Sequence, residues 1–366
     1  MDFDGSLSKM RDANSRTYRA AARAASALRA VVFVAVISAM LAGGVLTAAD
    51  GIVTRTEEVR SSAPAARPAA AVKSCRSFSL SPEEDARDLD AELLQTLYVF
   101  DRRSVPDGMV GIIPISLYRE PEEGKVWVSD AGDKKMIDVD EYLERSLPVG
   151  DARSDGYTVL RIHTHGTEAF SEEWALYAEP GSYPRSTDPE KNVIAIGEIF
   201  ADALNAAGIK TLHCREPVDA RSYSNAYSNA ADIIKEYIKE YPGIKYLLDI
   251  HRDSVDLTDG SKTRMVTACN GQPTAQVMFV VGTDRLVSAN KNWRDNMALA
   301  VRLQTELEAE YPGLMRPINV KHGAFNQYFT PLSLLIEIGC DGNSMAEAKR
   351  AARIVADRLV KTMTGR

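Results

Sequence analysis

Three short polar motifs, each at the end of an apolar run, bring imidazole and carboxylate groups into this chain. The residues that carry these groups are His163, His165, His251 and Glu337. The chain has only five histidines, and three of them lie in these motifs. Because imidazole and carboxylate are typical ligands of zinc, a metal site is the first hypothesis for this sequence.

These side chains can meet only if the apolar runs before them lie side by side. The predicted strands are residues 157–163, 209–213, 246–250, 276–281 and 334–338. The predicted helices are residues 189–207, 223–240, 290–311 and 344–363. Alternating strands and helices predict an α/β fold with a mostly parallel sheet and helices on both faces. In open sheets of this kind, ligands bind beyond the carboxyl ends of the strands, where the motifs are expected.

The chain divides into segments of different composition. The α/β pattern predicts a catalytic domain at 151–366, and residues 78–150 form a small accessory region without recognisable chemistry. Residues 51–77 are rich in alanine and proline and are predicted to be an extended linker. Residues 30–50 are predicted to be a transmembrane signal-anchor and residues 1–29 a cytoplasmic segment.

The membrane prediction rests on a charge-free run of about 20 residues at 30–49, long enough to cross a hydrocarbon core of about 30 Å. The basic residues before it are Lys9, Arg11, Arg16, Arg19, Arg23 and Arg29. Under the positive-inside rule the N-terminus stays in the cytoplasm and the remainder lies outside. A cleaved signal peptide is the alternative, since Thr47-Ala48-Ala49 suits a signal peptidase. In both cases the body is expected to be exported.

Composition excludes some classes of function. Hydrophobic residues make up 45% and charged residues 26% of the 366 positions, as in ordinary globular proteins. A net charge of −7 argues against nucleic acid as the main partner. The four cysteines form no C-x-x-C pair, so a thiolate zinc knuckle is not expected. If the domain lies outside the cytoplasm, one or two disulfide bonds can form, and the spacing does not show which cysteines pair.

The two histidines of the first motif are two positions apart. On an extended segment His163 and His165 would face the same side. A histidine that binds a metal needs an acceptor for its other ring nitrogen. The nearby carboxylates that could serve are Asp249, Asp253 and Glu168.

A mononuclear catalytic zinc usually takes three protein ligands and keeps one position open. Two histidines therefore leave room for a carboxylate, and Glu190 and Glu198 compete for that place on the helix predicted at 189–207. Glu190 is preferred because it lies in the first turn, which faces the carboxyl ends of the strands. Glu198 lies about 12 Å further along the helix. Either residue could instead belong to a solvated helix face.

Glu337 lies within an apolar strand, where a carboxylate is costly unless it is paired or its pKa is raised. Beside a zinc ion, Glu337 could act as a general base and then protonate the leaving amine. The alternative is a structural partner for a cation such as Arg252. Arg252 itself could anchor a substrate carboxylate or belong to a salt-bridged loop. His251-Arg252-Asp253 is also found in protein kinases, but position 258 is threonine and the other kinase motifs are absent.

Over residues 155–360 the chain resembles the stage II sporulation protein P family of bacterial cell-wall hydrolases. The motifs that carry the resemblance are His163 to Glu168, Asn192-Val193 with Ile196-Gly197, Ser222-Tyr223 with Ala226-Tyr227-Ser228, Asp249 to Asp253, Phe325-Asn326-Gln327, Leu335 to Gly339, Asn343 and Glu347-Ala348. The chain departs from the family pattern at Gly166 and at Glu168-Ala169-Phe170, where Glu-Ser-Tyr is usual. These loop changes leave the proposed ligands intact.

That family is similar to the zinc-dependent N-acetylmuramoyl-L-alanine amidases. The resemblance implies that His165, Glu190 and His251 hold Zn²⁺ and that Glu337 is catalytic, aided by Arg252. Second-shell or alternate ligands would be His163, Glu168 and Glu198. The spacing from Glu190 to Gly208 is one residue shorter than in the wider amidases.

The resemblance further implies a membrane-anchored peptidoglycan hydrolase of septal wall thinning and engulfment during endospore formation. The implied partners are the stage II sporulation proteins D and M. Two other functions stay open from the sequence. One is a zinc carboxypeptidase on stem peptides, and the other is a non-catalytic scaffold that binds the cell wall and retains the fold without turnover. Endopeptidase activity beside the amidase activity also stays open.

Overall fold

The computed structural model describes residues 100–117, 128–130, 139–173, 175–284 and 290–365. These residues belong to one compact unit within 79–366. The predicted segments 1–29, 30–50 and 51–77 lie outside the described residues, as does Cys75. None of the described helices is long and apolar enough to span a membrane.

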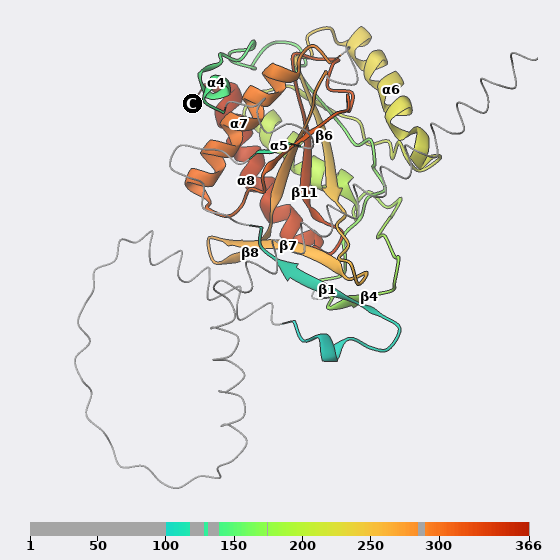
Figure 1. Cartoon of the computed structure of the whole chain (residues 1–366). Helices are drawn as coiled ribbons and strands as arrows, with labels where there is room; N and C mark the ends of the chain where they lie inside the picture. Colours follow the sequence, from blue (N-terminus) through green and yellow to red (C-terminus); the bar gives the residue numbers. More distant parts are fainter. Residues whose placement is uncertain (1–99, 118–127, 131–138, 174, 285–289, 366) are drawn as a thin grey trace, which may run out of the picture. The chain divides into compact units, whose positions relative to one another are not determined.

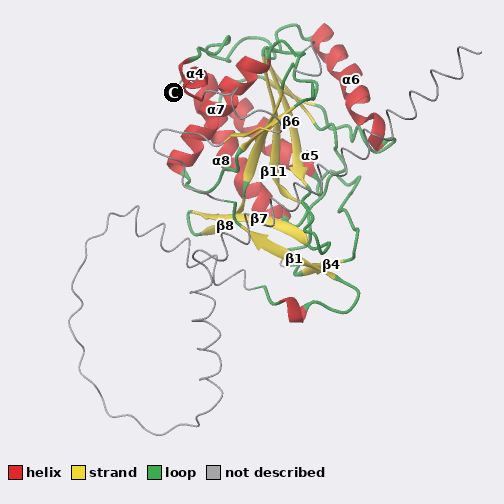
Figure 2. Ribbon diagram, in the orientation of Figure 1, coloured by secondary structure: helices red, strands yellow, loops and turns green. Residues whose placement is uncertain are grey.

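A seven-stranded sheet forms the centre of the unit (Figures 1 and 2), with strand order β2-β10-β9-β11-β6-β3-β5. Its strands are β2 (Val128–Asp130), β3 (Val159–Ile162), β5 (Thr211–His213), β6 (Tyr246–Asp253), β9 (Val277–Gly282), β10 (Ile318–Lys321) and β11 (Leu332–Cys340). Every pairing is parallel except that of β11 with β9. The predicted α/β class with a mostly parallel sheet is therefore confirmed.

Helices cover both faces of this sheet, as predicted, but unequally. The helices are α4 (Val139–Glu144), α5 (Val193–Ala206), α6 (Ala226–Glu240), α7 (Trp293–Glu310) and α8 (Met345–Thr364). One apolar cluster joins α4, α5, α7 and α8 to side chains such as Leu248 and Ile336. A smaller cluster joins α6 to side chains such as Leu160 and Leu247, which alternate with the first set. Figure 1 shows α6 across the strands from α7 and α8.

Polar residues cap the starts of α5 and α8. Ser344 accepts from the backbone N–H of Glu347, and the Glu347 carboxylate accepts from the N–H of Ser344. This reciprocal capping box fixes the start of α8. Asn192 accepts from the N–H of Ile194 and starts α5 at Val193, four residues later than the sequence predicts.

A second, four-stranded sheet has the order β4-β1-β7-β8. Its strands are β1 (Val110–Ile115), β4 (Tyr177–Ala178), β7 (Lys262–Cys269) and β8 (Gln272–Ala275). β1 pairs in parallel with β7, and Tyr142 of α4 packs against Trp293 of α7. The described parts of 78–150 are thus built into the same unit as the α/β region.

The last strand is shaped around the Glu-x-Gly motif. Glu337 lies opposite His251 in the parallel pair β11–β6, and the register shifts between Glu337 and Cys340. Gly339 has φ +70°, and a Cβ there would lie 2.8 Å from Oδ1 of Asn343. Glycine is required at this bulge, which ends the regular pairing just after Glu337.

Candidate active site

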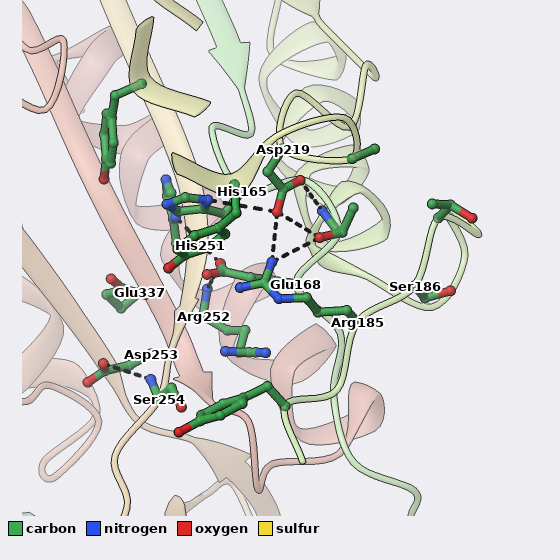
Figure 3. Close-up of a pocket in the computed structure, with 16 residues that line it drawn as sticks. His165, Glu168, Arg185, Ser186, Asp219, His251, Arg252, Asp253, Ser254 and Glu337 are labelled. Atoms are coloured by element: carbon green, nitrogen blue, oxygen red, sulfur yellow. Dashed lines mark hydrogen bonds and ion pairs between the residues drawn. The ribbon is translucent and has the colours of Figure 1, made fainter. Parts of the chain in front are cut away.

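One cavity of about 1060 Å³ lies where β3, β6 and β11 end (Figure 3). Six residues singled out from the sequence for a chemical role line it: His165, Glu168, His251, Arg252, Asp253 and Glu337. The same cavity is lined by Asp219, Arg185, Tyr223 and Tyr227, among others. The convergence expected at the carboxyl ends of parallel strands therefore occurs in the structure.

His251 lies between two buried carboxylates. Its Nδ1 is 3.4 Å from Oε2 of Glu168, and its Nε2 is 2.8 Å from Oδ1 of Asp249. Asp249 also accepts from the backbone N–H and the hydroxyl of Thr164, at 2.9 and 2.6 Å. Burial alone would lower the pKa of His251, but the charges of Asp249 and Glu168 outweigh it and raise this pKa well above its usual value.

His165 has a carboxylate beside it as well. Its Nδ1 lies 3.7 Å from Oδ2 of Asp219 and, although buried, makes no hydrogen bond. Asp219 is fixed by the N–H and hydroxyl of Thr167 and by Arg185. Burial raises the pKa of Asp219, but the neighbouring His165 and the hydrogen bonds from Thr167 lower it to about 2. An orienting carboxylate thus lies next to both histidines, as is usual around metal-binding imidazoles.

The donor set fits zinc. Ligands about 2.0–2.1 Å from a tetrahedral ion lie roughly 3.3 Å apart. The 3.4 Å between Nδ1 of His251 and Oε2 of Glu168 matches that spacing. Among the described residues, no three His, Cys, Asp or Glu side chains are arranged to hold an ion together. The donor atoms of His251 and Glu168 thus lie at the spacing of two zinc ligands. The imidazole of His165 is a third donor of a type that zinc binds.

Glu337 lies at the cavity with a carboxylate oxygen that has no partner. Its Oε2 is buried and accepts no hydrogen bond. Burial and the nearby charge of Asp253 raise the pKa of Glu337 to about 8. The alternative role as a partner of Arg252 is not supported, because Arg252 donates to two backbone carbonyls instead. An unpaired carboxylate aimed at the cavity is available for proton transfer.

Arg252 holds the loop that carries Glu168. Its Nε donates to the carbonyl of Ala169 at 2.9 Å, and its NH2 donates to the carbonyl of Pro184 at 2.8 Å. The backbone N–H of Arg252 donates to Oε2 of Glu168 at 3.1 Å. These bonds favour a positioning role for Arg252 over the substrate anchor that the sequence left open.

The structure does not bring Glu190, the preferred third ligand, to the cavity. Glu190 is exposed and precedes α5 in a turn, where its N–H donates to Oδ1 of Asp188. Glu168 does line the cavity, and its backbone N–H donates to the carbonyl of His165 at 3.0 Å in a tight turn. The carboxylate closest in position to the two histidines is therefore that of Glu168.

His163 and Glu198, which is part of α5, lie in a different cluster. The strand ends at Ile162, and the following turn separates His163 from His165, so the expected shared face is lost. Nε2 of His163 lies 2.9 Å from Nε2 of His213, and Nδ1 of His213 lies 2.7 Å from Glu198. Neither His163 nor Glu198 lines the cavity.

This second cluster is a chain of polar contacts. Nδ1 of His163 faces the carbonyl of Ile250 at 3.0 Å, so the chain from Ile250 to Glu198 contains three contacts. Burial and the charge of Arg161 lower the pKa of His213 to about 2, and burial also lowers the pKa of His163 well below its usual value. Both imidazoles are therefore neutral.

Gly197 permits α5 to lie on this cluster. A Cβ at Gly197 would be 2.4 Å from Cε1 of His163. Alanine normally improves a helix interior by about 1 kcal/mol, but overpacking a core typically costs about 1–3 kcal/mol. We expect Gly197→Ala to lower the free energy of unfolding, as measured by chemical denaturation.

The matched control is Gly156→Ala, since no atom lies within 4 Å of that Cβ position. The double variant Gly197→Ala/His163→Ala should recover part of the loss attributed to Gly197→Ala, because the clashing ring is gone. A Gly197→Ala protein as stable as the unsubstituted chain would contradict this packing.

Several cavity residues were not predicted as functional. Asp219 and Arg185 lie in irregular segments without a recognisable pattern, and they meet His165 only through the fold. The Tyr223 ring stacks on His165 with centroids 4.4 Å apart, and the Tyr227 ring meets it edge-on at 5.5 Å. The sequence did offer a signal for both tyrosines, since they belong to the motifs of the family resemblance.

Comparison with known sequences decides the family. The sequence profile of the stage II sporulation protein P family matches residues 119–360, which is more than half of the chain. The chain belongs to the stage II sporulation protein P family. Stage II sporulation protein P of Bacillus subtilis (strain 168) is 28% identical over 221 residues. This match covers 57% of the present chain and 52% of the relative, so the chain spans about half the length of the curated relative it matches.

Solved structures of amidases show a weak likeness to this member of the family. The N-acetylmuramyl-L-alanine amidase Ami1 from Mycobacterium smegmatis is 12% identical, with a TM-score of 0.35, over 59% of this chain and 100% of its own. AmiC2 of Nostoc punctiforme is 13% identical, with a TM-score of 0.36, over 57% and 97%. The CwlD amidase from Clostridioides difficile, solved with the GerS lipoprotein, is 12% identical, with a TM-score of 0.35, over 58% and 100%. Scores in this range do not establish a shared fold.

Proposed function

We propose that the chain is a zinc-dependent N-acetylmuramoyl-L-alanine amidase that hydrolyses peptidoglycan. The observation that carries this proposal is the meeting of His165, Glu168, His251 and Glu337 in one cavity. Two imidazoles, one carboxylate and a further carboxylate without a partner are the parts that metal-assisted amide hydrolysis needs. Membership of the stage II sporulation protein P family supports peptidoglycan as the substrate.

In this proposal His165, Glu168 and His251 hold the zinc ion. When bound, zinc would polarise the scissile carbonyl and make a water molecule more acidic. Asp249 and Asp219 orient the two imidazoles through their other ring nitrogens. Arg252 keeps Glu168 in place through its backbone N–H and through the carbonyls of Ala169 and Pro184.

Glu337 is the proposed general base. Its buried carboxylate takes a proton from the attacking water and then delivers it to the amine of the departing L-alanine. Among its neighbours, His251 is held by Asp249 and Asp253 by Arg316, and Oε2 of Glu337 has no hydrogen-bond partner. Glu337 thus remains free to exchange protons.

Arg185 is suited to bind a carboxylate of the stem peptide. Its NH1 is fixed by Thr167 and Asp219, and its guanidinium lies 4.6 Å above the Tyr223 ring. The side chain remains 35% exposed at the cavity. Arginine held in this way can still offer nitrogen donors to a planar anion.

We expect Arg185→Ala to weaken selection of peptides with a free carboxylate. A hydrogen bond to a charged group contributes about 1.5–3 kcal/mol, which corresponds to roughly a tenfold to a hundredfold change in kcat/KM. The measurement compares kcat/KM for muramyl peptides with free and with amidated carboxylates. The unsubstituted chain should prefer the free form, and the variant should not. An unchanged preference in the variant would exclude Arg185 as the anchor.

The proposal includes a single-pass membrane anchor with the catalytic domain outside the cytoplasm. It also places the activity in septal wall thinning and engulfment during endospore formation, with stage II sporulation proteins D and M as partners. These statements rest on the charge-free run at 30–49 and on the family. Protease added to intact protoplasts should digest the body and leave residues 1–29 protected.

The alternatives differ in their products and in their need for metal. A carboxypeptidase would release D-alanine from stem peptides, and a scaffold would bind the wall without releasing any fragment. Treating the purified full-length chain with a chelator should stop digestion of peptidoglycan, and zinc should restore it. Digestion that continues after complete removal of metal would refute a zinc enzyme.

A further inference from the structure

A second hollow adjoins the candidate active cavity. It has a volume of about 650 Å³ and lies between α6 and the segment 324–328. Tyr227 lines both hollows, so the two hollows lie on either side of this residue. Nothing in the mechanism proposed above uses the second hollow.

Aromatic rings lead from the active cavity into this hollow. The Tyr227 ring lies 5.5 Å from the His165 ring, and the Phe325 ring lies 5.8 Å from the Tyr227 ring. Tyr328 lines the hollow as well. Phe325 and Tyr328 are only partly buried, so ring surface remains available to a ligand.

The loop that carries Phe325 is held in an uncommon conformation. Phe325 and Asn326 have φ values of +46° and +55°, which side chains other than glycine rarely adopt. Asn326 donates to the carbonyl of Tyr227 at 2.9 Å. The Gln327 side chain accepts from the N–H of Gly282 and donates to the carbonyl of Val280, both at 2.8 Å. The aromatic wall is therefore built in a defined position relative to α6.

The two hollows differ in charge. In the second hollow Asp232 and Lys235 pair with each other at 2.8 Å, and the other lining residues are neutral. The active cavity instead contains Glu168, Asp219 and Arg185 among its lining residues. A charged peptide suits the active cavity, whereas a neutral ring with one apolar face and several hydroxyls suits the second hollow.

We propose that the second hollow is a glycan subsite, which binds an N-acetylated amino sugar of the strand that carries the stem peptide. This inference rests on the proposed function, because the bond cut by an amidase joins a sugar substituent to a peptide. An enzyme that cuts this bond must meet the sugar on one side and the peptide on the other. Tyr227, between the two hollows and edge-on to His165, marks that junction.

Two variants test the subsite, Phe325→Leu and Tyr328→Leu. Leucine at 325 keeps apolar contact with Met278, Val280 and Leu335 while removing the ring. Tyr157→Leu is the control, since Tyr157 is 38% exposed and its ring packs on Tyr241 away from either hollow. An aromatic contact of about 0.5–1.5 kcal/mol corresponds to a roughly twofold to tenfold change.

The first measurement compares a muramyl peptide that carries a tetrasaccharide with a lactyl peptide that lacks sugar. With both test variants, KM for the saccharide substrate should rise about twofold to tenfold, while kcat/KM for the lactyl peptide stays unchanged. Equal losses on both substrates, or no loss on either, would overturn the subsite.

The second measurement needs no catalysis, so it separates this inference from the proposed function. Glycan strands stripped of peptide should bind the full-length chain, and both test variants should weaken that binding while Tyr157→Leu does not. If the glycan does not bind, or if the variants instead weaken binding of the free stem peptide, the hollow is not a glycan subsite. Failure of the unsubstituted chain to cleave any substrate would refute the amidase proposal alone.

Discussion

Glu337→Gln should abolish most turnover and leave the fold and the metal in place. The amide has nearly the same shape as the carboxylate, so packing of β11 against β6 is kept, but it cannot accept a proton from the attacking water. General acid–base catalysis typically contributes about 10²- to 10⁴-fold, and we expect kcat to fall by that order. The measurement combines kcat on purified peptidoglycan with zinc content and thermal unfolding of the same protein.

Two outcomes would contradict these roles of Glu337 and of the zinc ligands. Near-normal hydrolysis by Glu337→Gln would remove the general-base role. Loss of zinc together with activity would instead show that Glu337 holds the metal, and the assignment of ligands would then be wrong. Because Oε2 of Glu337 has no partner in the structure, the substitution breaks no hydrogen bond at that atom.

Glu168→Gln should remove both the metal and the activity, whereas Glu190→Gln should change neither. Glu168 lies 3.4 Å from Nδ1 of His251 and on the tight turn after His165, so its charge is part of the proposed zinc site. Glu190 is an exposed residue of a turn outside the cavity. Each protein is purified, and its zinc content and its hydrolysis of peptidoglycan are measured.

These two variants form a matched pair, because the same substitution is made at the glutamate that the sequence favours as a ligand and at the one that lines the cavity. Loss of zinc in Glu190→Gln with retention in Glu168→Gln would exclude Glu168 as the third ligand and support Glu190. His251→Ala provides the positive control and should lose metal and activity together. Retention of full metal content by that variant would exclude His251 as a ligand.

The central sheet could be predicted because its strands are buried on both faces and therefore consist of apolar runs. β7 could not be predicted in the same way. It contains Lys262, which is 2% exposed, with its ammonium 2.9 Å from Asp256 and 3.3 Å from Asp341. Asp256 lies six residues before Lys262, whereas Asp341 comes from the segment after β11 and reaches Lys262 only through the fold. A charged residue of this kind at the start of a strand hides the strand from an apolar-run criterion.

The residues of the candidate site also differ in whether a sequence pattern marks them. His251 and Glu337 were found because each follows or ends a buried strand, and parallel pairing places them opposite each other. The sequence favours Glu190 over Glu198 because the predicted helix begins at Pro189 and has Glu190 in its first turn, but α5 begins only at Val193. Asp219 reaches His165 from an irregular loop after β5, and no periodic pattern marks such a residue.

The chemical identity of the new amino terminus tests the central claim most directly. Purified peptidoglycan is digested by the zinc-loaded full-length chain, the new amino groups are labelled, and the labelled residue is identified. The amidase account predicts L-alanine as the new amino-terminal residue, in an amount that increases with time and is absent with Glu337→Gln. Release of D-alanine without new L-alanine termini would contradict it, as would intact peptidoglycan after digestion with fully zinc-loaded protein.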